Sequence, residues 1–159
     1  MTGWVVEPVA ALISFREFYE LMANCKFPAA SFIRIKEHLE YLQEPDIFHE
    51  LFGHCPMLTC PSFAKFSKEL GRIGASLSDE DQVILGRLYW FTLEVGLIKT
   101  SHGLKIYGAG ILSSKGETIY ALDSDIPIRK DFNLLEVMRR PYPINRYQKL
   151  YYCINSFDE

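Results

Sequence analysis

The stretch PDIFHELFGHCP, residues 45–56, decides most about this 159-residue chain, because it places two histidines and an acid within six residues: His49, Glu50 and His54. The pattern is close to the HExxH motif of zinc proteases, but the second histidine comes one residue later. Residues i and i+4 lie about 40° apart around an α-helix, whereas residues i and i+5 lie about 140° apart. Two histidines at i and i+5 therefore cannot converge on one metal ion from a continuous α-helix.

The same stretch predicts where the chain turns. Pro45 suits the first turn of a helix, and Asp46 beside it is favourable to the helix dipole. Gly53 suits the position just past a helix end, and Pro56 supports a stop there. We therefore predict one histidine on the last turn of a helix and the other just beyond it, where both can bind one ion. Two hydrogen-bonded core histidines are the alternative, and this segment alone does not decide between them.

Further elements are predicted outward from this stretch. Ser14 and Glu17 form a capping box for a helix over residues 15–23, and Ser78 with Asp81 marks another helix start. The remaining predictions are a strand over 31–35, helical turns over 36–42, helices over 62–72, 78–95 and 133–140, turns or a small hairpin within 103–122, and a strand or helix start over 150–154. The sum is a mainly α fold with a few short β-strands.

Glu94 is the second chemical signal, since it is the only charged residue between Arg87 and Lys99. On an amphipathic helix it would point to water, but Trp90 and Phe91 make its own face apolar. An ionised carboxylate among apolar groups costs several kcal/mol unless a cation compensates it. A metal ion would supply that charge. The resulting two-histidine, one-carboxylate set serves non-haem Fe(II) and catalytic zinc sites, and consists of His49, His54 and Glu94.

Two weaker signals remain. The stretch YGAGILSS, residues 107–114, is glycine-rich but is neither a dinucleotide fingerprint nor a P-loop, so a tight turn between short strands is the interpretation that these residues favour. Arg34 offers bidentate hydrogen bonds to a carboxylate, although an isolated arginine is more typical of a surface.

Composition sets the broad class. Hydrophobic residues make up 48 % and charged residues 23 %, which is too apolar for disorder, and no apolar run approaches the roughly 20 residues of a membrane span. The net charge of −3 with 17 Lys and Arg argues against nucleic-acid binding. None of the four cysteines forms a CxxC pair, so we expect reduced thiols and a cytoplasmic protein. The oligomeric state stays open, with a monomer favoured.

Taken together, these segments resemble the pterin-dependent aromatic amino acid hydroxylases, and are most similar to the bacterial members that act on phenylalanine. The matching stretches are residues 45–56, 89–94 and 107–114, and residues 2–18 and 148–157 are also similar. The resemblance therefore covers nearly the whole chain in consistent order.

The resemblance implies a role for each candidate residue. Fe(II) would be bound by His49, His54 and Glu94. The tetrahydropterin would lie against Phe18, Ile13, Glu50 and Tyr89. Arg34 would hold the carboxylate of a small-molecule aromatic amino acid, in a pocket that also contains Pro45, Trp90 and Ser113. The implied reaction is ring hydroxylation, most simply phenylalanine to tyrosine, with tetrahydropterin as two-electron donor and O2 as oxidant.

The chain also departs from the family pattern. Leu42, Val95 and Pro28 replace residues common in relatives, which bears on substrate choice and pterin affinity, and the apolar Ile144 leans towards phenylalanine. Family catalytic domains continue on both sides of residues 1–159. We therefore expect one catalytic domain that lacks N-terminal and C-terminal parts and turns over poorly alone. The alternatives are a zinc hydrolase with Glu50 as base, and a non-catalytic remnant that binds amino acids.

Overall fold

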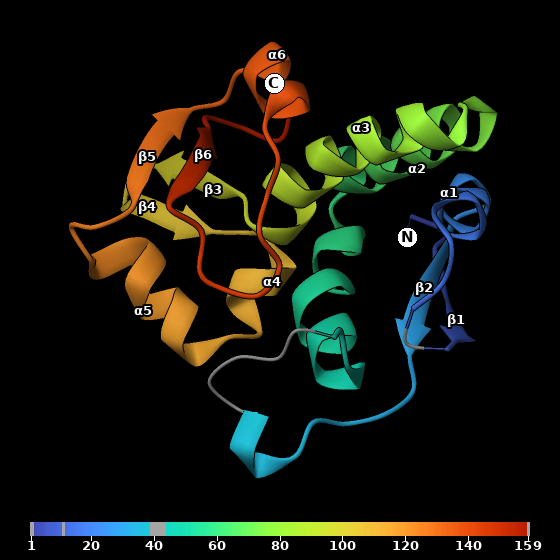
Figure 1. Ribbon diagram of the computed structural model, residues 1–159, viewed down its shortest axis with the longest axis horizontal. Helices are drawn as coiled ribbons and strands as arrows, with labels where there is room; N and C mark the ends of the chain where they lie inside the picture. The colour runs from blue at the N-terminus through green and yellow to red at the C-terminus, as the bar shows by residue number, and fades with distance from the viewer. Residues whose placement is uncertain (1, 11, 39–43, 159) are drawn as a thin grey trace.

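The computed structural model describes residues 2–10, 12–38 and 44–158 (Figure 1). Its architecture is mainly helical, as the sequence predicts. The α-helices are α1 (Phe15–Ala23), α2 (Pro61–Ser76), α3 (Asp79–Tyr89), α4 (Ala109–Leu112), α5 (Lys115–Asp123) and α6 (Leu134–Arg139). The other helical segments are the 3-10 turns η1 (Lys36–His38) and η3 (Met57–Thr59) and the π-helices η2 (His49–His54) and η4 (Trp90–Glu94).

Two small sheets accompany the helices. The parallel pair consists of β1 (Val5–Val9) and β2 (Lys26–Ala30). The other sheet has the order β4 (Gly103–Ile106), β3 (Leu97–Thr100), β6 (Leu150–Ile154) and β5 (Ile128–Asp131), with β3 and β4 antiparallel and β6 parallel to both neighbours. Figure 1 shows the two sheets on opposite sides of the molecule, with the helical segment that contains η2 between them. The metal-binding candidates therefore lie at the centre.

The helices α1 and α2 pack closely because two glycines remove the side chains between them. A Cβ at Gly74 would lie 2.3 Å from the ring of Tyr19, and a Cβ at Gly71 would lie 2.4 Å from the backbone nitrogen of Ala23. Tyr19 is consequently fully buried beneath α2. This packing fixes α1, the helix that carries Phe18, against the centre of the molecule.

Capping side chains start the helices where the sequence predicts them. The cap accepts the N–H of the residue three positions on at Ser14, Ser78 and Asn133. The helix over 15–23 is confirmed at both ends, α2 is longer than predicted, and the helix from residue 79 runs to Glu94 but ends as η4. The sequence prediction missed α5, although Ser114 caps it through the N–H of Glu117 in the same way.

The predicted strand over 31–35 is wrong, since these residues join no sheet. The backbone N–H of Arg34 donates to the side chain of Asp46, and the carbonyl of Phe32 accepts the N–H of Ile47, so the segment is tied to the start of the next helix instead. The strand in this region is β2, five residues earlier. Of the helical turns predicted over 36–42, η1 is present, and residues 39–43 lie outside the described residues.

The remaining predictions for the C-terminal half are resolved in detail. The small hairpin is formed by β3 and β4, so its second strand lies within the predicted range 103–122 and its first strand precedes that range. Residues 150–154 are a strand, and α6 matches the predicted helix. All four cysteines are free thiols.

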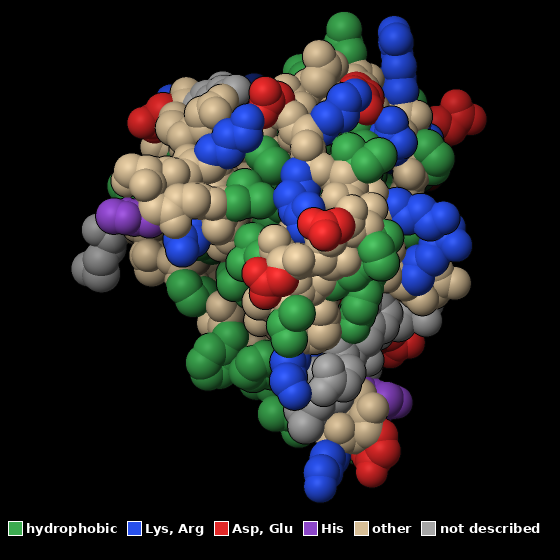
Figure 2. All heavy atoms as spheres, turned by 90° about the vertical axis from the view of Figure 1, so that its left-hand side faces the viewer, with side chains coloured by type: hydrophobic (Ala, Val, Ile, Leu, Met, Phe, Trp, Pro, Cys, Tyr) green, Lys and Arg blue, Asp and Glu red, His purple; other side chains and the backbone are tan. Residues whose placement is uncertain are grey.

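Within the described residues, no helix combines the length and the apolar character that crossing a membrane requires. Figure 2 shows Lys and Arg side chains interspersed with Asp and Glu on the face that carries β5 and α5.

Candidate metal centre and adjoining cavity

The helix predicted to stop at Gly53 continues through it as the π-helix η2. The N–H of Cys55 bonds to the carbonyl of Glu50, five residues earlier, at 3.1 Å. In a π-helix residues i and i+5 are joined by such bonds and so lie above one another, unlike in an α-helix. His49 and His54 therefore share one face of an unbroken helix. The objection that this spacing prevents convergence holds only for an α-helix.

Gly53 is required by packing rather than by a turn. A Cβ at this position would lie 2.6 Å from the Cβ of Ala109 and 2.9 Å from its Cα. The absent side chain lets η2 lie directly on α4, the short helix formed by the glycine-rich stretch. The tight turn between strands that we expected at residues 107–114 is thus wrong, because Gly108 caps a helix there. Asp46, not Pro45, starts the segment, since its carboxylate accepts the N–H of His49 at 3.0 Å.

The second π-helix, η4, carries Glu94. The N–H of Val95 bonds to the carbonyl of Trp90 at 2.9 Å, which is again a five-residue step. A Cβ at Gly108 would lie 2.4 Å from the carbonyl oxygen of Glu94, and a Cβ at Gly110 would lie 3.2 Å from its Oε2. The same α4 region therefore backs both π-helices. Glu94 is buried, 9 % exposed, so the alternative in which it points to water is wrong.

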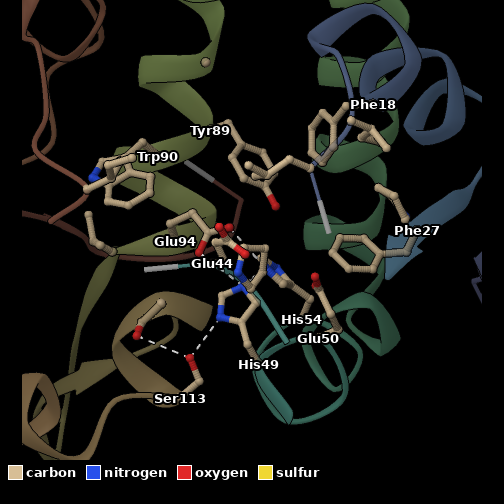
Figure 3. A pocket seen from close by; sticks show the side chains of 18 of the residues that line it. Phe18, Phe27, Glu44, His49, Glu50, His54, Tyr89, Trp90, Glu94 and Ser113 are labelled. Atoms are coloured by element: carbon tan, nitrogen blue, oxygen red, sulfur yellow. Dashed lines mark hydrogen bonds and ion pairs between the residues drawn. The ribbon is translucent and has the colours of Figure 1, made fainter. Parts of the chain in front are cut away.

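The three predicted ligands meet at distances that one metal ion would require. His54 Nε2 lies 3.0 Å from His49 Nε2 and 3.1 Å from Oε1 of Glu94, and His49 Nε2 lies 3.6 Å from Oε2 of Glu94 (Figure 3). Two ligand atoms that bind one ion at about 2.1 Å and at right angles are about 3.0 Å apart. The three side chains are therefore close enough together to hold one divalent ion.

The electrostatics of the cluster agree with this. Burial alone would raise the pKa of Glu94, but the charges of His54 and His49, with hydrogen bonds from His54 and Tyr89, lower it to about 2. Burial acts to lower the pKa of His54, yet Glu94 and Glu50 raise it above its usual value. Burial lowers the pKa of His49 to about 4. The carboxylate of Glu94 is thus ionised, and it lies close to two imidazole nitrogens that could bind the same metal ion.

Glu50 is a competing third ligand. Ligand atoms of His49, Glu50 and His54 all lie within 4.8 Å of one another. The carboxylate of Glu94 is closer to both histidines, and burial raises the pKa of Glu50 to about 7. Distance and charge therefore favour Glu94 as the third ligand and place Glu50 beside the centre.

Ser113 supports the cluster from behind. Its hydroxyl lies 2.9 Å from Nδ1 of His49, the ring nitrogen that faces away from the other ligands. Such a bond fixes the orientation of a metal-binding imidazole. By contrast, Nδ1 of His54 is buried and has no hydrogen-bond partner among the described residues. The sequence analysis predicts Ser113 only in the amino-acid pocket and does not predict this contact.

Arg34 is buried, contrary to what an isolated arginine suggests. It donates to both oxygens of Asp46, from Nη2 at 2.6 Å and from Nε at 2.9 Å, and its side chain is 4 % exposed. Nη1 donates to the carbonyl of Ser113 at 2.7 Å. Burial alone would raise the pKa of Asp46, but the bonds from Arg34 and His49 lower it to about 2. These bonds hold the guanidinium in one orientation. Its other N–H groups make no hydrogen bond within the described residues.

One cavity of about 270 Å³ is lined by all eleven candidates: Ile13, Phe18, Arg34, Pro45, His49, Glu50, His54, Tyr89, Trp90, Glu94 and Ser113. Figure 3 shows Phe18 and Tyr89 to one side of the ligand cluster, and Trp90 and Ser113 to the other. We call these sides the ring end and the Arg34 end, the latter after the arginine that bonds to Ser113. Of the departures from the family pattern, Pro28, Val95 and Ile144 also line the cavity, and Leu42 lies outside the described residues.

The sequence analysis missed other lining residues. Phe27, on β2, lies with its ring centroid 4.7 Å from that of His54, at the ring end. Tyr142 stacks on Trp90 at 4.5 Å with the planes 9° apart, at the Arg34 end. Glu117 also lines the cavity. Phe27 and Tyr142 lie in segments without a recognisable motif. For Glu117 a signal was available, because Ser114 caps the helix through the N–H of Glu117.

Comparison with known proteins identifies the arrangement. Residues 1–159 match the family described as biopterin-dependent aromatic amino acid hydroxylase. The chain belongs to this family. Among curated hydroxylases, phenylalanine-4-hydroxylase of Pseudomonas aeruginosa is 56 % identical over 153 residues, which cover 96 % of this chain and 58 % of that protein. The family predicted from residues 45–56, 89–94 and 107–114 is therefore confirmed.

Solved structures of hydroxylases have the same fold. The apo structure of the cold-active phenylalanine hydroxylase from Colwellia psychrerythraea has a TM-score of 0.95 and 52 % identity, over 99 % of this chain and 60 % of that one. The enzyme from Chromobacterium violaceum, described with bound iron(III) and 7,8-dihydrobiopterin, has a TM-score of 0.95 and 47 % identity, over 99 % of this chain and 58 % of that one. The chain thus spans little more than half the length of these relatives.

Proposed function

We propose that this chain forms the iron- and tetrahydropterin-binding part of an aromatic amino acid hydroxylase whose substrate is phenylalanine. The observation that carries the proposal is the convergence of His49, His54 and Glu94 within 3.6 Å in a member of this family. The relative from Chromobacterium violaceum, whose structure holds iron and a dihydropterin, supports the choice of both cofactors.

The ligand set would hold Fe(II), which supplies a site for O2 when bound. The chain's own residues then fix the ligands. Ser113 orients His49 through Nδ1, and Tyr89 donates a hydrogen bond to Glu94. Because the carboxylate and the imidazole of His49 are each held by a hydrogen bond from outside the cluster, two of the three ligand side chains keep a fixed orientation.

The two ends of the cavity suit two different flat molecules. At the ring end, Phe18 packs against Tyr89 with centroids 4.9 Å apart and ring planes at 84°, and a bicyclic pterin in the cavity would stack on Phe18. Ile13 and Glu50 line the same cavity and would lie along the pterin edge. These contacts would hold the reductant beside the ion without binding to it.

At the Arg34 end, the guanidinium would bind the substrate carboxylate. Its fork is fixed by Asp46 and by the Ser113 carbonyl, so little rotational entropy is lost on binding. Trp90 and Pro45 would form apolar walls for the substrate ring, which must then point towards the metal ligands. Closing this space with rings also excludes water from the reacting groups.

The test is aerobic incubation of the chain with Fe(II) and tetrahydropterin, and with phenylalanine, tyrosine and tryptophan in parallel. Formation of tyrosine from phenylalanine supports the proposal, and the same assay on a chain extended at its N-terminus checks whether residues 1–159 turn over poorly alone. Absence of hydroxylated product from every amino acid with both chains, despite bound iron, would refute it.

The other functions are less well supported. The comparisons give no support to a zinc hydrolase, although η2 removes the spacing argument against it. A binding remnant would retain amino-acid affinity without turnover, and the same assay separates it from an enzyme. Cytoplasmic location and a monomeric state stay predictions from cysteine usage and sequence.

A further inference from the structure

Glu117, in the first turn of α5, is a buried acid that the proposed reaction does not use. It is 3 % exposed and lines the same cavity as Arg34 and Trp90. The hydroxyl of Tyr151 donates to Oε1 at 2.7 Å, and the N–H of Gln148 donates to the same oxygen at 3.3 Å. Among the described residues, no hydrogen bond reaches Oε2. This second oxygen is therefore available to a donor in the cavity.

The charge of Glu117 also lacks a partner within the described part of the chain. Burial raises the pKa of its carboxyl, and only the hydrogen bonds from Tyr151 and Gln148 oppose that rise. No lysine, arginine or histidine in the described segments contributes. A buried carboxylate without a cation is costly, so a cationic ligand group would be bound favourably there.

The position of Glu117 relative to Arg34 specifies which cation. Nη1 of Arg34 donates to the carbonyl of Ser113 at 2.7 Å, and the hydroxyl of Ser114 accepts the N–H of Glu117 at 3.3 Å. The guanidinium of Arg34 and the backbone of Glu117 are thus bonded to the neighbouring residues Ser113 and Ser114, and both side chains line one cavity. An α-amino acid carries its carboxylate and its ammonium on one carbon, so a cation and an anion that line one cavity match its two charges.

We propose that Glu117 binds the α-ammonium group of the amino-acid substrate, next to Arg34 at the substrate carboxylate. The inference rests on the proposed function and makes it more specific: the site selects amino acids with a free amine over aromatic carboxylic acids of the same size. Glu44 is the other acid of the cavity that no assigned role uses, but it is exposed, and a charge in water binds a cation weakly.

The test is calorimetric titration of the chain with phenylalanine and with 3-phenylpropanoate, which lacks only the amine. We expect the unmodified chain to bind phenylalanine at least about tenfold more tightly, as expected for a hydrogen bond to a charged group. Glu117→Gln keeps acceptors for Tyr151 and Gln148 but removes the charge. It should weaken phenylalanine by about tenfold or more and leave 3-phenylpropanoate unchanged or tighter.

Glu44→Gln is the matched control, since it makes the same charge change in the same cavity. We expect this variant to bind phenylalanine and 3-phenylpropanoate as tightly as the unmodified chain does. If Glu117→Gln weakened the binding of both ligands equally, its role would be purely structural and the inference would be overturned. A loss of phenylalanine affinity alone in Glu44→Gln, and not in Glu117→Gln, would overturn it as well. Should Glu117→Gln fail to fold by circular dichroism, equal affinity of the unmodified chain for both ligands would still overturn it. Failure of the unmodified chain to bind phenylalanine at all would overturn the proposed function itself.

Discussion

The two ends of the cavity are built on different physical principles. The ring end is formed by aromatic side chains: Phe18 packs against Tyr89, and Phe27 packs against the imidazole of His54. The Arg34 end is formed around a buried ion pair, whose hydrogen bonds leave the guanidinium one orientation. The difference teaches that one end can select by shape and stacking, and the other by charge. The three proposed metal ligands lie between the two ends, so each end can be disturbed separately.

The largest effect should come from removing the carboxylate of Glu94, because the ligand cluster lies between the two ends of the cavity. Glu94→Ala deletes the carboxylate that lies nearest the two histidines, so we expect loss of iron binding and of all hydroxylation. Iron content after anaerobic loading and product formation are the measurements.

Glu50→Ala is the matched control for Glu94→Ala. It removes the competing carboxylate of the cluster, and we expect it to retain iron. Iron loss in Glu50→Ala with retention in Glu94→Ala would reverse the ligand assignment.

Arg34→Gln should disturb the Arg34 end alone. Breaking a buried hydrogen-bonded charge pair costs about 2–5 kcal/mol, so phenylalanine affinity should fall at least about thirtyfold while the affinity for tetrahydropterin stays constant. Titration of each ligand separately measures this.

The same change leaves Asp46 buried without its cation and should lower the free energy of unfolding. The double variant Arg34→Gln, Asp46→Asn removes both charges and should regain much of that stability without regaining phenylalanine affinity. Recovery of phenylalanine binding in the double variant would contradict the role of Arg34.

Phe18→Leu should disturb the ring end by a smaller amount. Loss of one stacking face is worth about 0.5–1.5 kcal/mol, so the KM for tetrahydropterin should rise by about tenfold at most, with the KM for phenylalanine unchanged. Phe15→Leu is the control on the same helix, since Phe15 stacks on Tyr19. Equal effects of the two variants would indicate a change in α1 rather than lost stacking.

Mild acid should weaken the metal centre before it affects the Arg34 end. The pKa of His54 is raised, so its protonated form competes with the metal from above pH 6.5 downward, whereas the pKa of His49 is about 4 and that of Asp46 about 2. One proton then competes between pH 6.5 and 5, and metal affinity should fall by about tenfold per pH unit. Co(II) titrations across this range measure the slope; a pH-independent affinity would contradict it.

The parts of the site that sequence could predict are those set by residue chemistry. The caps at Ser14 and Ser78, the two histidines and the lone acid of an apolar helix are all local signals, and each is where it was expected. The resemblance then supplied the lining residues. No local signal marks the close packing of η2 on α4, because it brings Gly53 against Ala109, more than fifty residues away. Likewise the burial of Arg34 depends on Asp46, which the strand prediction for 31–35 ignored.

The five-residue hydrogen-bond step of η2 also bears on how metal sites of different classes are related. Omitting Phe52 would convert HELFGH into HELGH, the HExxH arrangement of zinc proteases, which an ordinary α-helix displays on a single face. An insertion of one amino acid, absorbed by widening a helical turn, is thus enough to separate the two sequence signatures while the imidazoles still meet. Searches that fix the number of residues between histidines overlook such sites, and helix radius is the variable they would have to include.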